Sequence, residues 1–179
     1  MKKLLYILLA VAFLPFTSCL KDDDVDYTEW MNRNTKYYDN ALAQTDPSGN
    51  KVFELYTPEW AKGCPVLIQW HNQRNLNAIR PMDNSVCDII YVTKDIDGKI
   101  LDNSYSNTVY GDSIYRTKPL GNITGFWAAL TQMSEGDSVT VITPSVSAYG
   151  MTGRGNVKPY STLIFGIKLK KIVSWELPS

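Results

Sequence analysis

Residues 86 to 173 switch repeatedly between strand-like runs and turns, with a single helical stretch among them. Successive side chains of a strand point to opposite faces of a sheet, so alternating or β-branched runs indicate strands. Such runs cover residues 87–93, 139–143 and 162–173. One short helix among roughly five or six strands predicts an α+β architecture, in which an antiparallel β-sheet wraps on that helix.

A hairpin and a helix are the clearest local signals in this region. Asp97-Gly98 is typical of a tight hairpin turn, and it separates residues 87–93 from a return strand at Ile100-Leu101. Helical spacing over residues 123–132 places four apolar side chains on one face, namely Phe126, Ala129, Leu130 and Met133.

The pattern of the residues before residue 86 predicts an N-terminal extension made of a helix and strands. Aromatic and apolar residues recur at three- and four-residue spacing over residues 26–44, which predicts a helix. A turn cluster at residues 46–50 ends it. Residues 52–56 and 66–71 are strand-like, whereas residues 72–81 are polar and predict a loop.

The N-terminus is typical of a targeting segment. Lys2 and Lys3 precede an apolar run over residues 4–16, which is shorter than the roughly 20 residues of a spanning helix. Phe16-Thr17-Ser18-Cys19 resembles the cleavage box of bacterial lipoproteins, in which the cysteine carries the lipid, with Phe16 in place of the usual leucine. We therefore expect a lipid anchor at Cys19, which is the predicted contact with the membrane. An ordinary secretory signal with an incidental cysteine is the alternative.

The predicted organisation follows from these signals. Residues 1–18 are a signal peptide, 19–26 an acidic tether, 27–84 the N-terminal extension and 85–173 the main domain. The tether resembles surface-sorting signals of Gram-negative lipoproteins, although a plain solvated spacer explains it equally well. We expect the protein in a Gram-negative cell envelope, at the outer membrane and facing the periplasm or the surface.

Composition argues against several function classes. With 18 basic and 18 acidic residues the chain lacks the charge pattern of a nucleic-acid binder. His71 is the only histidine, and no ligand spacing surrounds it, so we expect neither a metal nor a cofactor. An exported chain permits a disulfide between Cys64 and Cys87. Both cysteines also fit buried strand positions, so their pairing stays open.

Aromatic, acidic and glycine residues of the second half follow a characteristic order. Its members are Tyr91, Asp97-Gly98, Leu101-Asp102, Ile123, Gly125, Phe126, the helix sequence from Ala129 to Gly136, Tyr149, Val157 and Phe165. This order and spacing resemble the FKBP-type peptidyl-prolyl isomerase domain over about residues 86–173. The combination is specific, whereas no single member is.

The resemblance implies a pocket that catalyses rotation of Xaa–Pro bonds in polypeptide clients. By that resemblance, the Tyr149 hydroxyl and the Ile123 backbone N–H would bind peptide carbonyl groups, and Asp102 would orient groups at the rim. The implied walls are Tyr91, Phe126, Val157 and Phe165. An apolar pocket would favour the less polar twisted amide over the planar one, without a nucleophile or proton transfer.

Two departures from the family pattern keep other functions open. The best-studied family members have tryptophan at the pocket floor, where this chain has Phe126 followed by Trp127. The loop at residues 151–159 is also shorter than in compact members. The alternatives are a catalytically weak peptide-binding module or chaperone that grips proline-containing segments, and a structural lipoprotein with a filled pocket.

Overall fold

The structure is a computed structural model that describes residues 25–174. The predicted signal peptide, the lipidation site Cys19 and most of the acidic tether therefore lie outside the described residues. In chain order, the described elements are α1 (Thr28–Ala43), β1 (Glu54–Tyr56), η1 (Glu59–Ala61), β2 (Val66–Trp70), β3 (Val86–Lys94), β4 (Ile100–Asn103), β5 (Tyr115–Thr117), η2 (Pro119–Gly121), α2 (Thr124–Leu130), β6 (Ser138–Thr143), η3 (Ser145–Ser147) and β7 (Leu163–Ser174).

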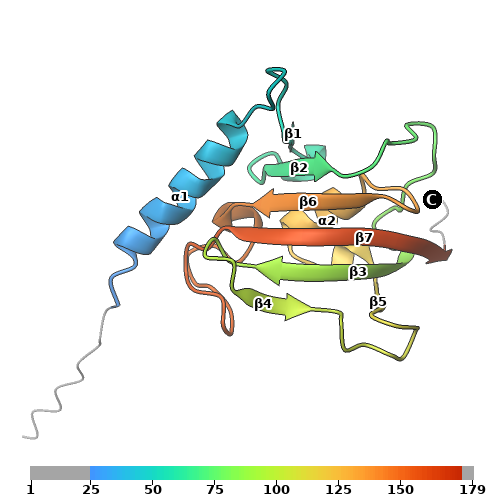
Figure 1. Ribbon diagram of the computed structural model, residues 1–179. Helices are drawn as coiled ribbons and strands as arrows, with labels where there is room; N and C mark the ends of the chain where they lie inside the picture. The colour runs from blue at the N-terminus through green and yellow to red at the C-terminus, as the bar shows by residue number, and fades with distance from the viewer. Residues whose placement is uncertain (1–24, 175–179) are drawn as a thin grey trace, which may run out of the picture.

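All described strands belong to one antiparallel sheet in the order β1-β2-β6-β7-β3-β4, with β5 paired to β3 (Figure 1). The 12-residue strand β7 lies at the centre, between β3 and β6. Its apolar residues alternate, and Leu163, Phe165 and Ile167 are all buried beneath helix α2. This period-two pattern is the reason that the sequence predicts the strand.

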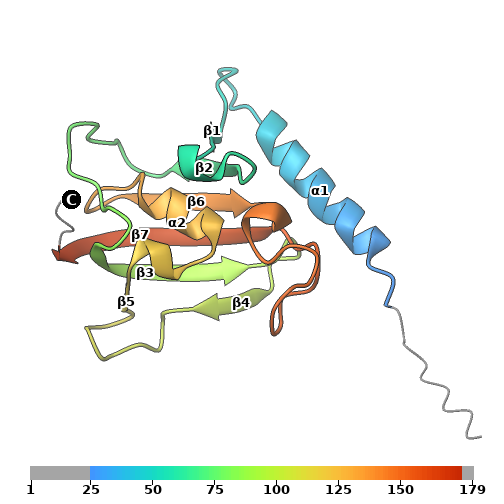
Figure 2. The same ribbon diagram turned by 180° about the vertical axis from the view of Figure 1, so that it is seen from behind.

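Helix α2 covers one face of the sheet (Figure 2). Gly125 allows this close approach, because a Cβ atom there would lie 2.3 Å from Cγ2 of Thr143 on β6. Phe126 and Leu130 then reach the core between the helix and the sheet. The α+β fold with a short helix on an antiparallel sheet is thus confirmed.

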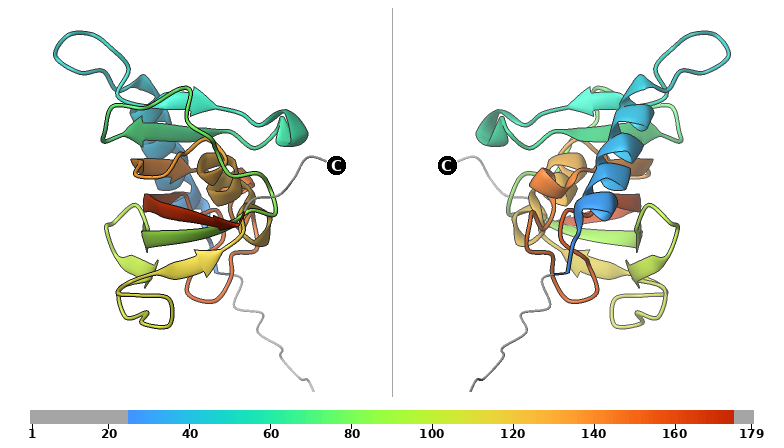
Figure 3. Two further views of the ribbon diagram at one scale, coloured as in Figure 1. Left: turned by 90° about the vertical axis from the view of Figure 1, so that its right-hand side faces the viewer. Right: turned by 90° about the vertical axis from the view of Figure 1, so that its left-hand side faces the viewer.

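Helix α1 lies beside the ends of the strands, where β6 ends and β7 begins, and its C-terminal part packs against the face of the sheet opposite α2 (Figure 1 and Figure 3). Ala41 packs with Phe53, Leu67 and Ile142 in a second, smaller apolar cluster. Neighbouring residues of β2 point to opposite faces, so Leu67 contacts the α1 side while residues 66 and 68 contact the α2 side.

Most boundaries agree with the prediction to within two residues. The sequence does not predict strand β5, because three residues are too few for a visible alternation. Strands β1 and β2, which fall in the predicted extension, continue the same sheet as the main domain. The predicted boundary at residue 84 is therefore not a break in the sheet.

The expectation that Cys64 occupies a buried strand position is wrong. Cys64 precedes β2 and is half-buried, with its thiol 3.5 Å from the Val146 carbonyl oxygen. Cys87 is buried in β3, and burial raises the pKa of its thiol to about 12. Both cysteines are free thiols. Within residues 25–174, no helix is long and apolar enough to cross a bilayer.

Candidate active site

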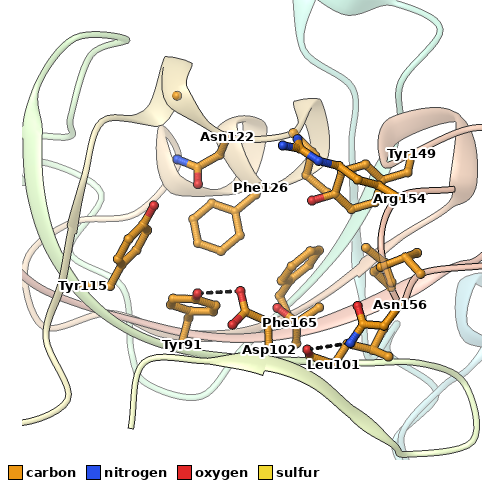
Figure 4. Close-up of a pocket in the computed structure, with 15 residues that line it drawn as sticks. Tyr91, Leu101, Asp102, Tyr115, Asn122, Phe126, Tyr149, Arg154, Asn156 and Phe165 are labelled. Atoms are coloured by element: carbon orange, nitrogen blue, oxygen red, sulfur yellow. Dashed lines mark hydrogen bonds between the residues drawn. The ribbon is translucent and has the colours of Figure 1, made fainter. Parts of the chain in front are cut away.

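A cavity of about 550 Å³ opens between strands β3 and β4, helix α2 and the loop that joins β6 to β7 (Figure 4). We refer to residues 144–162 as the β6–β7 loop. All seven residues of the predicted pocket line this one cavity: Tyr91, Asp102, Ile123, Phe126, Tyr149, Val157 and Phe165. The structure therefore brings together residues from five parts of the chain: β3, β4, the start of α2, the β6–β7 loop and β7.

Three aromatic rings form the floor of the cavity. The ring of Phe126 lies edge-on to Phe165, with centroids 5.3 Å apart, and edge-on to Tyr91 at 6.0 Å. Phe126 and Phe165 are almost fully buried, whereas Tyr91 keeps one side toward the opening. Edge-to-face contacts of this kind hold the rings in fixed orientations. The floor is therefore apolar and rigid.

Asp102 fixes the orientation of Tyr91. The Tyr91 hydroxyl donates to Oδ2 of Asp102 at 2.7 Å, and the Asn103 backbone N–H donates to Oδ1 at 2.8 Å. Burial, followed by this hydrogen bond, raises the pKa of Tyr91 above its usual value. The neutral phenol is thus favoured, and both carboxylate oxygens of Asp102 already accept a hydrogen bond.

Two donors at the cavity remain uncommitted. Among residues 25–174, neither the Tyr149 hydroxyl nor the Ile123 backbone N–H makes a hydrogen bond. Tyr149 projects from the β6–β7 loop toward the space above Phe126 (Figure 4). Ile123 has extended backbone angles and immediately precedes α2. These two groups are therefore available to a peptide that enters the cavity.

Trp127 does not contribute to the floor. Its indole stacks on Trp60 with centroids 3.8 Å apart, and its Nε1–H donates to Oδ1 of Asp83 at 2.7 Å. Successive residues of a helix point about 100° apart, so Phe126 and Trp127 face different directions. Phe126 alone supplies the helix's aromatic ring to the cavity, and Trp127 instead joins the helix to the N-terminal part of the chain.

Several lining residues carry no sequence pattern that predicts a place in the pocket. They are Thr93, Leu101, Tyr115, Gly121, Asn122, Arg154, Asn156 and Leu163. The ring centroid of Tyr115 lies 5.3 Å from that of Tyr91, on a strand too short for its pattern to be recognised. Arg154 and Asn156 fall in a glycine-rich segment, which was the one signal that could have drawn attention to them.

The described lining of the cavity holds no histidine, cysteine or lysine and a single carboxylate. Among its described lining residues only Asp102 and Arg154 carry a charge, and Arg154 lies over the Tyr149 ring with 6.0 Å between the guanidinium carbon and the centroid. Across residues 25–174, no group of three or more histidine, cysteine or acidic side chains could hold a metal ion. The arrangement can enclose an apolar segment, exclude water from it and orient its carbonyl groups.

Comparison with known proteins agrees with this geometry. Residues 77–170 match the model of the family described as FKBP-type peptidyl-prolyl cis-trans isomerase. The chain is 32% identical over 94 residues to the FKBP-type peptidyl-prolyl cis-trans isomerase FkpA of Escherichia coli K12. That match covers 50% of this chain and 32% of the relative, so the chain spans about a third of the relative's length.

Solved structures show the same fold. A peptidyl-prolyl cis-trans isomerase from Pseudomonas syringae pv. tomato DC3000 has a TM-score of 0.64 at 21% identity, covering 83% of this chain and 96% of that one. FkpA from Escherichia coli has a TM-score of 0.62 at 22% identity, covering 81% and 60% respectively.

Proposed function

The chain belongs to the FKBP-type peptidyl-prolyl cis-trans isomerase family, and from this membership we propose that it catalyses rotation of Xaa–Pro bonds in polypeptides. The observation that carries the proposal is the cavity itself, in which a buried aromatic floor faces two uncommitted hydrogen-bond donors. Proline-containing polypeptides are the proposed substrates.

The chemistry needs only binding and desolvation. Resonance in the amide bond imposes a rotation barrier of about 20 kcal/mol, which makes uncatalysed isomerisation slow. Twisting the bond breaks conjugation and reduces its charge separation. A dry floor of Phe126, Phe165 and Tyr91 therefore stabilises the twisted amide relative to the planar one.

We propose that the polar groups orient the peptide. The Tyr149 hydroxyl and the Ile123 N–H each donate to a substrate carbonyl, and Val157 closes the wall beside the proline ring. Asp102 acts mainly through Tyr91, because both of its oxygens already accept hydrogen bonds. Val157 and Leu101 supply apolar contact on the side nearest the loop.

A prolyl isomerisation assay on the chain from residue 20 onward tests this proposal. We expect a proline-containing peptide to isomerise faster with the protein than without it, and a tight-binding inhibitor of the family to abolish the acceleration. Peptide binding without turnover would instead favour the peptide-binding module, for which the Phe126 floor is the motivating feature. A chain that neither binds nor isomerises such peptides would overturn both functions.

We further propose that Cys19 carries a lipid and that the protein assists folding in a Gram-negative envelope. The support is the order of a basic start, an apolar run and then Thr17-Ser18-Cys19. Cys19→Ala should release the protein from membranes or block its processing, as seen by fractionation and by mass spectrometry of the N-terminus. Unchanged processing and membrane retention in that variant would remove the lipid anchor from the proposal.

A further inference from the structure

Helix α1 is bonded to the segment that carries Val157. Asn34 of α1 is only 2% exposed, and its Oδ1 accepts the Thr162 backbone N–H at 2.6 Å. The Thr162 hydroxyl donates to the Asn34 carbonyl oxygen at 3.2 Å, while the Asn34 amide donates to the Trp30 carbonyl oxygen at 2.7 Å. A buried polar group bonded this completely fixes the position of both partners.

Trp30 makes a second connection one helical turn earlier. Its Nε1–H donates to Oγ of Ser161 at 3.0 Å, and the Ser161 hydroxyl donates in turn to the Lys158 carbonyl oxygen at 2.8 Å. The Lys158 ammonium lies 4.5 Å from the centroid of the Trp30 ring. The indole is 9% exposed, so it is packed into the loop rather than resting on its surface.

The segment that α1 holds is one side of the candidate active site. We call residues 154–162 the Val157 wall. A second cavity of about 170 Å³ lies between Trp30 and this wall, and it shares Leu101, Asn156 and Val157 with the main cavity. These three residues therefore have the substrate cavity on one side and α1 on the other.

Strand β4, which adjoins the Val157 wall, is also connected to helix α1. Asn156 donates to the Leu101 carbonyl oxygen at 3.1 Å, which joins the wall to β4. Arg33 of α1 forms an ion pair with Asp97 in the turn between β3 and β4. Helix α1 thus contacts both segments that meet at Leu101 and Asn156.

We infer that α1 is a positioning element for the active site, in which Asn34 and Trp30 hold the Val157 wall in its substrate-binding position. The expected change in KM rests on the proposed function, whereas the expected effect on the position of the Val157 wall does not. If the Val157 wall leaves that position for part of the time, only the remaining fraction of the molecules can bind substrate. The apparent affinity for substrate then falls to that fraction of its full value. The turnover of bound substrate changes little, because the floor and Tyr149 do not contact α1 through these bonds.

The test compares two variants of α1 in the chain from residue 20 onward. Asn34→Ala leaves the Thr162 N–H buried without its partner, so we expect KM to rise about fivefold to tenfold with kcat within about twofold. Leu42→Ala weakens the packing of the same helix at its other end, away from the wall. We expect this control to lower stability while KM stays at the wild-type value.

Amide hydrogen exchange gives a readout that does not depend on activity. Asn34→Ala should accelerate exchange across residues 154–162, whereas Leu42→Ala should not. Equal KM increases in both variants, or unchanged KM and exchange in Asn34→Ala, would overturn the inference. If the wild type shows no turnover, the proposed function fails, and exchange alone decides: selective acceleration in Asn34→Ala supports the positioning role, and its absence refutes it.

Trp30→Phe covers the case in which Asn34→Ala does not fold. This change keeps most of the ring packing and removes the hydrogen bond to Ser161. We expect a smaller KM increase of about twofold to fivefold. Ser161→Ala removes the same bond together with the bond from Ser161 to the Lys158 carbonyl oxygen. The double variant should therefore raise KM no more than Ser161→Ala alone, and full additivity of the two single increases would contradict the connection.

Discussion

The two sides of the active-site cavity are built on different principles. The floor consists of Tyr91, Phe126 and Phe165, which project from regular strands and a helix into the main core. The opposite side is the β6–β7 loop, most of whose residues are half-buried or exposed and which turns through left-handed glycines. The floor owes its order to hydrophobic packing, whereas the loop owes its order to hydrogen bonds within itself and to α1.

Because of this difference, a substitution can change activity without a large change in stability on the loop side of the cavity, but not on the floor side. A change in the floor alters the core and the desolvation of substrate together, so the two effects are coupled. A change in the loop affects hydrogen bonding or wall position with little loss of core packing. Substitutions of decreasing severity can test whether the two sides are as distinct as this comparison implies.

The largest effect should come from Phe126→Ala. Removing a ring that is 4% exposed opens the floor to water, and we expect a loss of about 3–5 kcal/mol in the free energy of unfolding. Isomerase activity per folded molecule should also fall strongly. Urea unfolding and the prolyl assay measure the two effects. A loss of stability with unchanged activity per folded molecule would show that the floor is only a core, and the comparison would fail.

Gly153→Ala should produce an intermediate effect on the loop side. Gly153 has φ of +67°, and a Cβ atom there would lie 2.3 Å from the Val157 carbonyl oxygen, so the Val157 wall must move. We expect about 1–3 kcal/mol of destabilisation together with a raised KM.

Gly155→Ala is the matched control for this change. Gly155 has φ of +57° but no atom within 4 Å of the added Cβ, so it should lose stability with little change in KM. If Gly153→Ala and Gly155→Ala have the same KM, displacement of the wall is not important for binding.

Tyr149→Phe should reduce activity modestly and leave stability nearly unchanged. The hydroxyl has no partner among the described residues, so its removal breaks no bond of the folded protein. Loss of one orienting hydrogen bond of about 1 kcal/mol should lower kcat/KM about fivefold. Thermal unfolding and steady-state kinetics measure both quantities. A marked loss of stability would show that the hydroxyl supports the folded protein and is not free to serve the substrate.

The smallest expected effect is that of pH on activity. Carboxylates and tyrosines ionise near pH 4 and 10 in the absence of perturbation, so activity should stay nearly constant from about pH 6 to 8. A bell-shaped profile centred near neutrality would indicate a general acid or base and would refute the desolvation mechanism.

Tyr91 should nevertheless make stability depend on alkaline pH. Burial, then the hydrogen bond to Asp102, raises the pKa of Tyr91, so the folded protein retains the phenol proton after the unfolded chain has lost it. The stabilisation is complete below about pH 10 and declines as pH rises toward the raised value. The difference in unfolding free energy between wild type and Tyr91→Phe should therefore shrink from pH 9 to pH 11, and a constant difference would contradict this assignment.

Local pattern was enough to predict the elements that form the floor. Alternation identifies β3 and β7, helical spacing identifies α2, and these periods determine that Phe126 and Phe165 face the core. The order of Tyr91, Asp102, Tyr149 and Val157 then indicated the family. The sequence could not indicate that Trp127 stacks on Trp60, because periodicity shows which face is buried and not which partner covers it.

By itself, the sequence determined most strands of the sheet and the short helix, since these depend on local periodicity. Its resemblance to the family, and not periodicity, indicated the seven residues that meet at the cavity. The tertiary structure alone decided how the wall of that cavity is held. Asn34 and Thr162 are 128 residues apart in the sequence, and no local pattern at either residue predicts that the two are hydrogen-bonded. Hydrogen bonds between distant segments depend on where the whole chain folds, so the role of α1 emerged only once the fold was known.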